Sequence, residues 1–126
     1  MEKALKEFVE SLLLKRRKCP WGKNRNLASQ FEELEKEVAE LKEAITTGTV
    51  AELREEFGDV FWDLLFIGII AEEKGLFTMR EAIEEAHAKL KRRAPWVFGS
   101  EKVATEQEAI KRWNEIKALE KQAKKK

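Results

Sequence analysis

The stretch Glu56-Phe-Gly-Asp-Val-Phe-Trp-Asp-Leu-Leu-Phe-Ile-Gly-Ile-Ile70 decides the fold. Its three carboxylates, Glu56, Asp59 and Asp63, are separated by three and four residues, so on a helix they occupy a sector roughly 60° wide. Core-forming residues such as Val60 and Ile67 lie in or beside the same sector. Carboxylates in that position are costly unless a cation or a proton compensates their charge. The stretch therefore predicts a long helix with an acidic site on its core-facing side.

Helical periodicity continues along nearly the whole chain, and no segment alternates convincingly as a strand does. Pro20 and Gly22 interrupt the first helix, and Gly75 is expected to end the third. We expect a single all-α domain over residues 1–126, with residues 121–126 as a frayed tail. Its bundle of about five helices has a four-helix core completed by dimerisation. The expected helices run to about Lys18, from about Ala28 to Thr46, from about Val50 to Lys74, from Thr78 to Arg93 and from Thr105 onward.

Composition narrows the function classes. The 126 residues include 25 basic and 24 acidic side chains, a net charge of +1, which gives no general attraction to nucleic acid or an anionic membrane. The lone cysteine, Cys19, excludes an intramolecular disulfide and fits a reducing compartment. No N-terminal stretch has a signal-peptide layout, and the apolar run from Val60 to Ala71 is too short to span a bilayer. We expect a cytoplasmic protein without a nucleic-acid or membrane partner.

A second acidic cluster, Glu37-Val-Ala-Glu40, lies on the preceding expected helix. Antiparallel packing of the two helices would bring this cluster opposite Glu56 and Asp59. Four carboxylates repel one another unless a divalent cation neutralises them, and oxygen ligands favour Mg²⁺, Mn²⁺ or Ca²⁺ over zinc. The residues alone leave a second interpretation open, in which the row around Glu37 is a solvated helix face. Asp63 likewise has an alternative, as a core carboxylate satisfied by Trp62 or Arg54.

At these residues the chain resembles the MazG family of nucleoside triphosphate pyrophosphohydrolases, which belongs to the all-α NTP pyrophosphatase superfamily. The family pattern is Glu-x-x-Glu followed by Glu-x-x-Asp, here Glu37 to Glu40 and, after fifteen intervening residues, Glu56 to Asp59. The resemblance covers about a hundred residues, from Cys19 to Glu120. Further matching segments are Cys19-Pro-Trp21, Leu53-Arg-Glu-Glu-Phe-Gly-Asp59, Lys89-Leu-Lys-Arg-Arg-Ala-Pro-Trp-Val-Phe98 and Arg112-Trp-Asn-Glu-Ile-Lys117. The chain departs from the family at Gly22, usually Asp, at Lys36, often Glu, and at Ala94 and Trp96, which replace two histidines.

The resemblance implies Mg²⁺-dependent hydrolysis of a nucleoside triphosphate, with Mn²⁺ as a substitute, releasing a nucleoside monophosphate and pyrophosphate in nucleotide-pool housecleaning. The implied metal-holding and catalytic residues are Glu37, Glu40, Glu56 and Asp59. Asp63 is expected to bind the metal as well, or to interact with the metal ligands without contacting the metal itself. The implied contacts to the triphosphate are Lys89, Arg93, Trp113 and Lys117.

A rival interpretation comes from the apolar stripe of the second expected helix. Leu27, Phe31, Leu34, Val38, Leu41 and Ile45 step by four and three, as a coiled-coil seam does. On this interpretation the chain is a non-catalytic helical interaction module, and it tolerates loss of the carboxylates. The two interpretations can also be combined, and we expect the stripe to build a homodimer or a dimer of dimers that completes the active site. A kinase or motor ATPase is disfavoured because the chain has no Gly-rich Walker loop.

Overall fold

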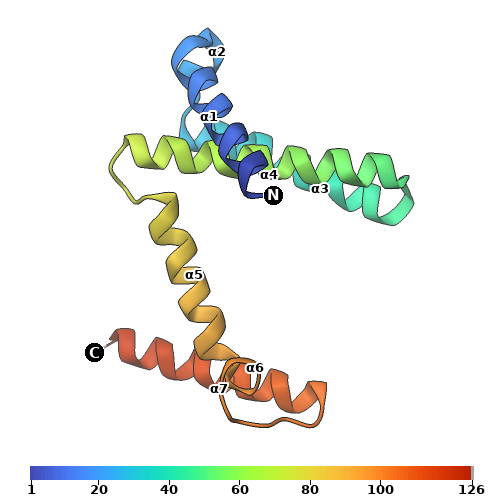
Figure 1. Cartoon of the computed structure of the whole chain (residues 1–126), viewed down its shortest axis with the longest axis vertical. Coiled ribbons are helices and arrows are strands. Elements are labelled where there is room, and N and C mark those ends of the chain that lie inside the picture. The colour runs from blue at the N-terminus through green and yellow to red at the C-terminus, as the bar shows by residue number, and fades with distance from the viewer. Residues whose placement is uncertain (126) are drawn as a thin grey trace. The chain divides into compact units, whose positions relative to one another are not determined.

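The chain is built from helices throughout. The computed structural model describes residues 1–125, and over that range it contains seven helices and no strand (Figure 1), which confirms the all-α prediction. The helices are α1 (Glu2–Lys18), α2 (Pro20–Lys23), α3 (Leu27–Thr47), α4 (Val50–Glu73), α5 (Met79–Arg93), α6 (Pro95–Phe98) and α7 (Glu106–Lys125).

Two of the helices were not expected. The four-residue helices α2 and α6 begin at Pro20 and Pro95. Pro20 was expected only to interrupt the first helix, and the fourth helix was expected to end at Arg93, ahead of Pro95. Proline suits the first position of a helix, because its missing N–H would have no partner there and its φ is already helical. Over the expected tail, α7 continues through Lys125. Lys126 lies outside the described residues.

Local capping explains where the long helices begin and end. The side chain of Asn26 accepts a hydrogen bond from the Ser29 amide, and the Ser29 hydroxyl accepts one from the Asn26 amide, which forms a capping box for α3. Thr49 caps α4 by accepting from the Glu52 amide. Gly75, with φ of 68°, ends α4 in the left-handed conformation, as its position predicted.

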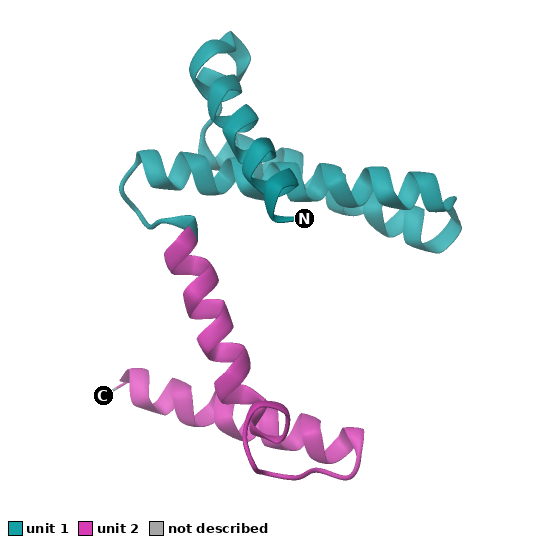
Figure 2. Cartoon of the chain, viewed as in Figure 1, with its two compact units in different colours: residues 1–79 teal, residues 80–126 magenta. Residues whose placement is uncertain are grey.

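The chain divides into two compact units, residues 1–79 and a second unit that begins at Arg80 (Figure 2). In the first unit, α3 and α4 form an antiparallel hairpin joined by Gly48 and Thr49, and α1 crosses it. This hairpin positions the candidate site. In the second unit, an ion pair between Arg93 on α5 and Glu120 on α7 joins the two longer helices.

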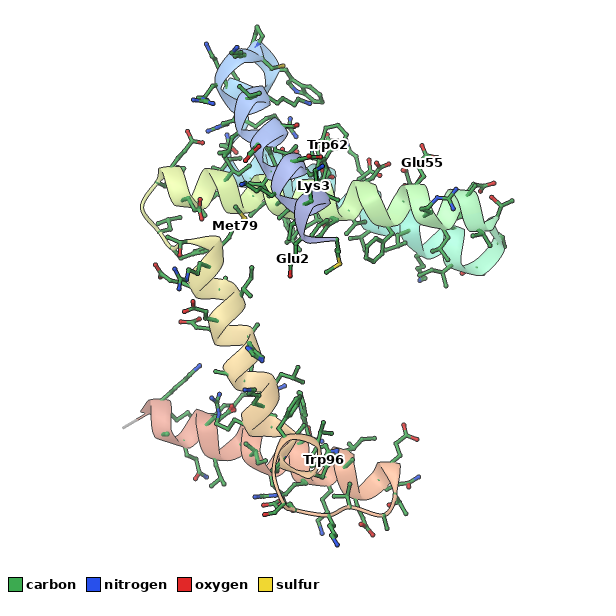
Figure 3. All side chains as sticks on the ribbon, in the orientation of Figure 1. Glu2, Lys3, Glu55, Trp62, Met79 and Trp96 are labelled. Atoms are coloured by element: carbon green, nitrogen blue, oxygen red, sulfur yellow. The ribbon has the colours of Figure 1, made fainter. Side chains whose placement is uncertain are left out.

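The core of the first unit lies at one end of the long acidic helix. Its buried side chains are Leu12 from α1 and Phe66, Ile69 and Ile70 from α4, and Met79 packs against them (Figure 3). Toward its N-terminal end the same helix is more open, since Phe57 and Leu64 are 64% and 53% exposed. None of the helices over residues 1–125 combines the length and apolar character that crossing a bilayer requires.

Candidate metal centre

Three carboxylates meet between the two helices of the hairpin. Glu37 reaches from α3, and Glu56 and Asp59 reach from α4, each offering an oxygen within 4.8 Å of the other two. Glu40 is more exposed than these three but interacts with both Glu37 and Glu56. The structure thus brings together the two acidic clusters that the sequence placed on successive helices, because the short connection at Gly48 and Thr49 makes the helices antiparallel.

Two oxygens of this cluster lack partners. Glu37 Oε2 and Glu56 Oε2 are buried, and neither has a hydrogen-bond partner among the described residues. A buried carboxylate oxygen without a partner is costly, and neighbouring carboxyl groups can bond one another only if one holds a proton. The orphaned oxygens and the all-oxygen donor set fit a hard divalent cation such as Mg²⁺ or Mn²⁺.

The electrostatics of the cluster agree with this fit. Burial, reinforced by Glu40, raises the pKa of Glu37 from an ordinary 4.5 to about 7. Burial also raises the pKa of Glu56, again with a contribution from Glu40. The shifts have the direction expected where like charges and desolvation disfavour ionisation. The pocket between the helices therefore favours an added positive charge, whether a proton or a metal ion.

Asp63 occupies a different position from the group of three. Its Oδ1 accepts a hydrogen bond from Gln30 Nε2 at 3.0 Å, rather than from Trp62 or Arg54, the partners named in the alternative interpretation. Gln30 is 5% exposed, and its Oε1 accepts a bond from Arg25 Nε at 3.3 Å. Burial, followed by the charge of Glu33, raises the pKa of Asp63. No signal in the sequence indicated Gln30, although it stands between the half-buried Leu27 and Leu34 on α3.

A pocket of about 200 Å³ adjoins the carboxylates, and Glu37 and Asp59 form part of its wall. One basic and two aromatic side chains also line the pocket. Lys15 Nζ lies 4.8 Å from the centroid of the Trp21 ring and 5.0 Å from the centroid of the Trp62 ring. Trp21 is 59% exposed, which argues against a role limited to filling space in the core. The pocket joins flat aromatic surfaces and positive charge to the acidic cluster.

The predicted triphosphate contacts lie in the second unit. Arg93 on α5 and Trp113 on α7 meet, with Arg93 Cζ 5.7 Å from the Trp113 ring centroid. Lys89 and Lys117 are exposed on the same two helices. Arg93 Nε also donates to Glu120 at 3.0 Å, a contact between residues 27 apart that no local pattern indicated.

Comparison with known proteins gives one consistent family. The model of the MazG nucleotide pyrophosphohydrolase domain matches residues 25–98. A crystal structure of a mazG-related protein from Thermotoga maritima superposes with a TM-score of 0.80 and 32% identity, covering 90% of this chain and 98% of that one.

Two curated relatives agree with this match. The chain is 37% identical over 107 residues to the nucleoside triphosphate pyrophosphohydrolase/pyrophosphatase MazG of Thermotoga maritima, covering 85% of this chain and 40% of that protein. It is 31% identical over 102 residues to the nucleoside triphosphate pyrophosphohydrolase of Escherichia coli strain K12, covering 81% of this chain and 39% of that protein. The chain thus spans about two fifths of the length of these relatives. The chain belongs to the MazG nucleotide pyrophosphohydrolase domain family.

Proposed function

We propose that the chain hydrolyses nucleoside triphosphates between the α and β phosphates, releasing a nucleoside monophosphate and pyrophosphate. The observation that carries the proposal is the pair of buried, unpartnered oxygens on Glu37 and Glu56 within the cluster completed by Asp59. Those three residues and Glu40 would hold Mg²⁺, or Mn²⁺ in its place, and Asp63 would support the site from its edge. The bound cation would supply charge neutralisation for phosphoryl oxygens and a lowered pKa for an attacking water.

The pocket beside the carboxylates is the proposed seat of the nucleoside. Trp21 and Trp62 offer flat surfaces for a base, and Lys15 between them offers a positive charge. The Gln30 amide holds Asp63 in place at the pocket wall, so this carboxylate presents a defined acceptor to the ligand. Discrimination between bases and sugars would arise at these side chains.

The whole chain, residues 1–126, is proposed to act as one domain. The side chains proposed to contact the triphosphate are Lys89, Arg93, Trp113 and Lys117. Exposed apolar side chains on the hairpin, such as Phe31, Phe57 and Leu64, support assembly into a homodimer or a dimer of dimers. Nucleotide-pool housecleaning in the cytoplasm, without a nucleic-acid or membrane partner, is the physiological role that follows.

Product identity tests the proposed reaction. We expect the purified chain, given Mg²⁺ and a panel of ribo- and deoxynucleoside triphosphates, to release equal amounts of nucleoside monophosphate and pyrophosphate. Chelation of the cation should stop the reaction, and added Mn²⁺ should restore it. Nucleotides in the panel that differ only in base or sugar measure the discrimination assigned to the pocket. Formation of a nucleoside diphosphate and inorganic phosphate, without pyrophosphate, would refute cleavage of the α–β bond.

The pKa of Glu37 predicts how the stability of the metal-free chain depends on pH. Because the folded-state pKa is about 7 and the ordinary value is 4.5, the folded chain holds this proton more tightly than the unfolded chain does. The free energy of unfolding should therefore fall as the pH rises from about 4.5 to about 7. Mg²⁺ competes with the proton, so it should raise the melting temperature more at pH 8 than at pH 5. In a Glu37→Gln variant, the rise in melting temperature caused by Mg²⁺ should differ less between pH 8 and pH 5. An equal rise at both pH values in the wild type would contradict the prediction.

A further inference from the structure

The guanidinium of Arg93 is held on two sides within the second unit. Its Cζ lies 5.7 Å from the centroid of the Trp113 ring, a distance at which a cation is attracted to the ring face. Its Nε lies 3.1 and 3.0 Å from the two carboxylate oxygens of Glu120. The side chains of Arg93 and Glu120 are only 15% and 16% exposed, so the contact is sheltered from solvent. Arg93 is therefore a fixed cation rather than a mobile one.

Glu120 does not use the two terminal nitrogens of Arg93. Glu120 engages the Nε atom, and among residues 1–125 no hydrogen bond is recorded to the two terminal nitrogens of Arg93. A guanidinium binds phosphate through these planar, paired donors. Arg92 Nη2 also donates to Glu120 Oε1, at 2.8 Å. The two arginines hold the pKa of Glu120 down to about 2, so it stays ionised, and the group of three side chains retains one net positive charge.

Glu120 lies on the same face of α7 as two of the proposed substrate contacts. Trp113, Lys117 and Glu120 are four and three residues apart, which places them one above another on a helix. Glu120 therefore reaches Arg93 from the side of α7 that carries Trp113. The Trp113 ring and the Glu120 carboxylate, which both contact Arg93, therefore lie on one helix, α7.

We infer that Glu120 is a positioning residue, which binds Arg93 Nε and, with Trp113, aims the terminal nitrogens of Arg93 at the triphosphate. The inference rests on the proposed function and assigns Glu120 no contact with the substrate. A carboxylate that only joined α5 to α7 would affect stability without a selective effect on substrate binding. The two roles are therefore separable by kinetics.

The test compares Glu120→Ala and Glu120→Gln with the wild type in Mg²⁺-dependent pyrophosphate release. We expect Glu120→Ala to raise KM about tenfold with kcat changed less than about twofold, because loss of a charge-assisted support weakens binding by that order. Glu120→Gln, whose amide oxygen still accepts from Nε, should show a smaller rise. Glu115→Ala is the matched control, since it removes an ion pair with Arg112 from the same helix without touching Arg93. This control should keep the wild-type KM.

A double substitution at Glu120 and Arg93 tests whether Glu120 acts on KM through Arg93 or only joins α5 to α7. In an Arg93→Ala background, Glu120→Ala should cause no further rise in KM, because the group that it orients is gone. An additive rise, an unchanged KM in Glu120→Ala or an equal rise in Glu115→Ala would overturn the inference while leaving the proposed function standing. If Glu120→Ala fails to fold, Glu120→Gln carries the same comparison. A wild-type chain that releases no pyrophosphate would overturn the proposed function and this inference together.

Discussion

Replacement of Glu56 by glutamine is expected to reduce Mg²⁺-dependent pyrophosphate release by at least ~100-fold. Loss of a group that only hydrogen-bonds to a metal ligand already lowers metal affinity or activity by about 10- to 100-fold. The change removes one charge from the three-carboxylate cluster and leaves an amide where a cation needs an anionic oxygen. The fold should survive, because Glu56 Oε2 has no hydrogen-bond partner to lose among the described residues. Metal-free Glu56→Gln should be at least as stable as the wild type at pH 8, where repulsion within the cluster is greatest. Pyrophosphate assays and urea unfolding measure the two effects.

Glu55→Gln is the matched control for this experiment. It makes the same chemical change one residue earlier on α4, at an exposed side chain (Figure 3) that is not one of the three clustered carboxylates. Its activity should remain close to that of the wild type. The interaction-module interpretation expects the two variants to behave alike. Retention of pyrophosphate release by Glu56→Gln at the level of Glu55→Gln would therefore reject the metal centre as the seat of catalysis.

Gly22→Ala is expected to lower the free energy of unfolding by about 1–3 kcal/mol, the usual cost of forcing an extra group into a packed site. A Cβ at residue 22 would lie 2.6 Å from the backbone oxygen of Lys15, and backbone has little freedom to withdraw. The Gly22 carbonyl also accepts a bond from Arg16 Nη1 at 2.7 Å, which ties α2 to α1. Gly22→Asp, which introduces the residue usual at this position in the family, adds the same Cβ and should be at least as harmful. Urea unfolding of the metal-free variants measures the loss.

Gly58→Ala provides the comparison for the glycine experiment. A Cβ at residue 58 would meet nothing within 4 Å. In the middle of α4, alanine should therefore raise the free energy of unfolding by about 0.5–1 kcal/mol, because glycine loses more backbone entropy on folding. The two substitutions are identical in chemistry and opposite in expected sign. A Gly22→Ala variant as stable as the wild type would show that α1 and α2 can separate without cost.

The departure at Gly22 thus has a steric explanation that the sequence did not contain. In the sequence, Gly22 was only a departure from the aspartate that is usual in the family. The structure shows α2 packed so closely on α1 that a side chain at this position would strike the Lys15 carbonyl. The same packing lets Lys15 lie beside the Trp21 ring at the edge of the pocket.

The sequence by itself determined the features that depend on neighbours along the chain. Helix positions and the placing of Glu56 and Asp59 on one face follow from three- and four-residue spacing, which is local. The pairing of Glu37 with these two residues was also foreseeable, because a two-residue connection between long helices makes them antiparallel. Proline-led helices such as α2 were missed because an interrupting proline can equally well begin a short helix.

Only the tertiary structure decided which side chains meet across long separations. Asp63 is bonded by Gln30, 33 residues away, rather than by the nearby Trp62 or Arg54, and Arg93 is bonded by Glu120. Packing also decided that the apolar stretch is buried around Ile70 and open around Phe57. These outcomes depend on the register of packed helices and on side-chain rotamers, which are set by all neighbours at once and leave no periodic trace in the sequence.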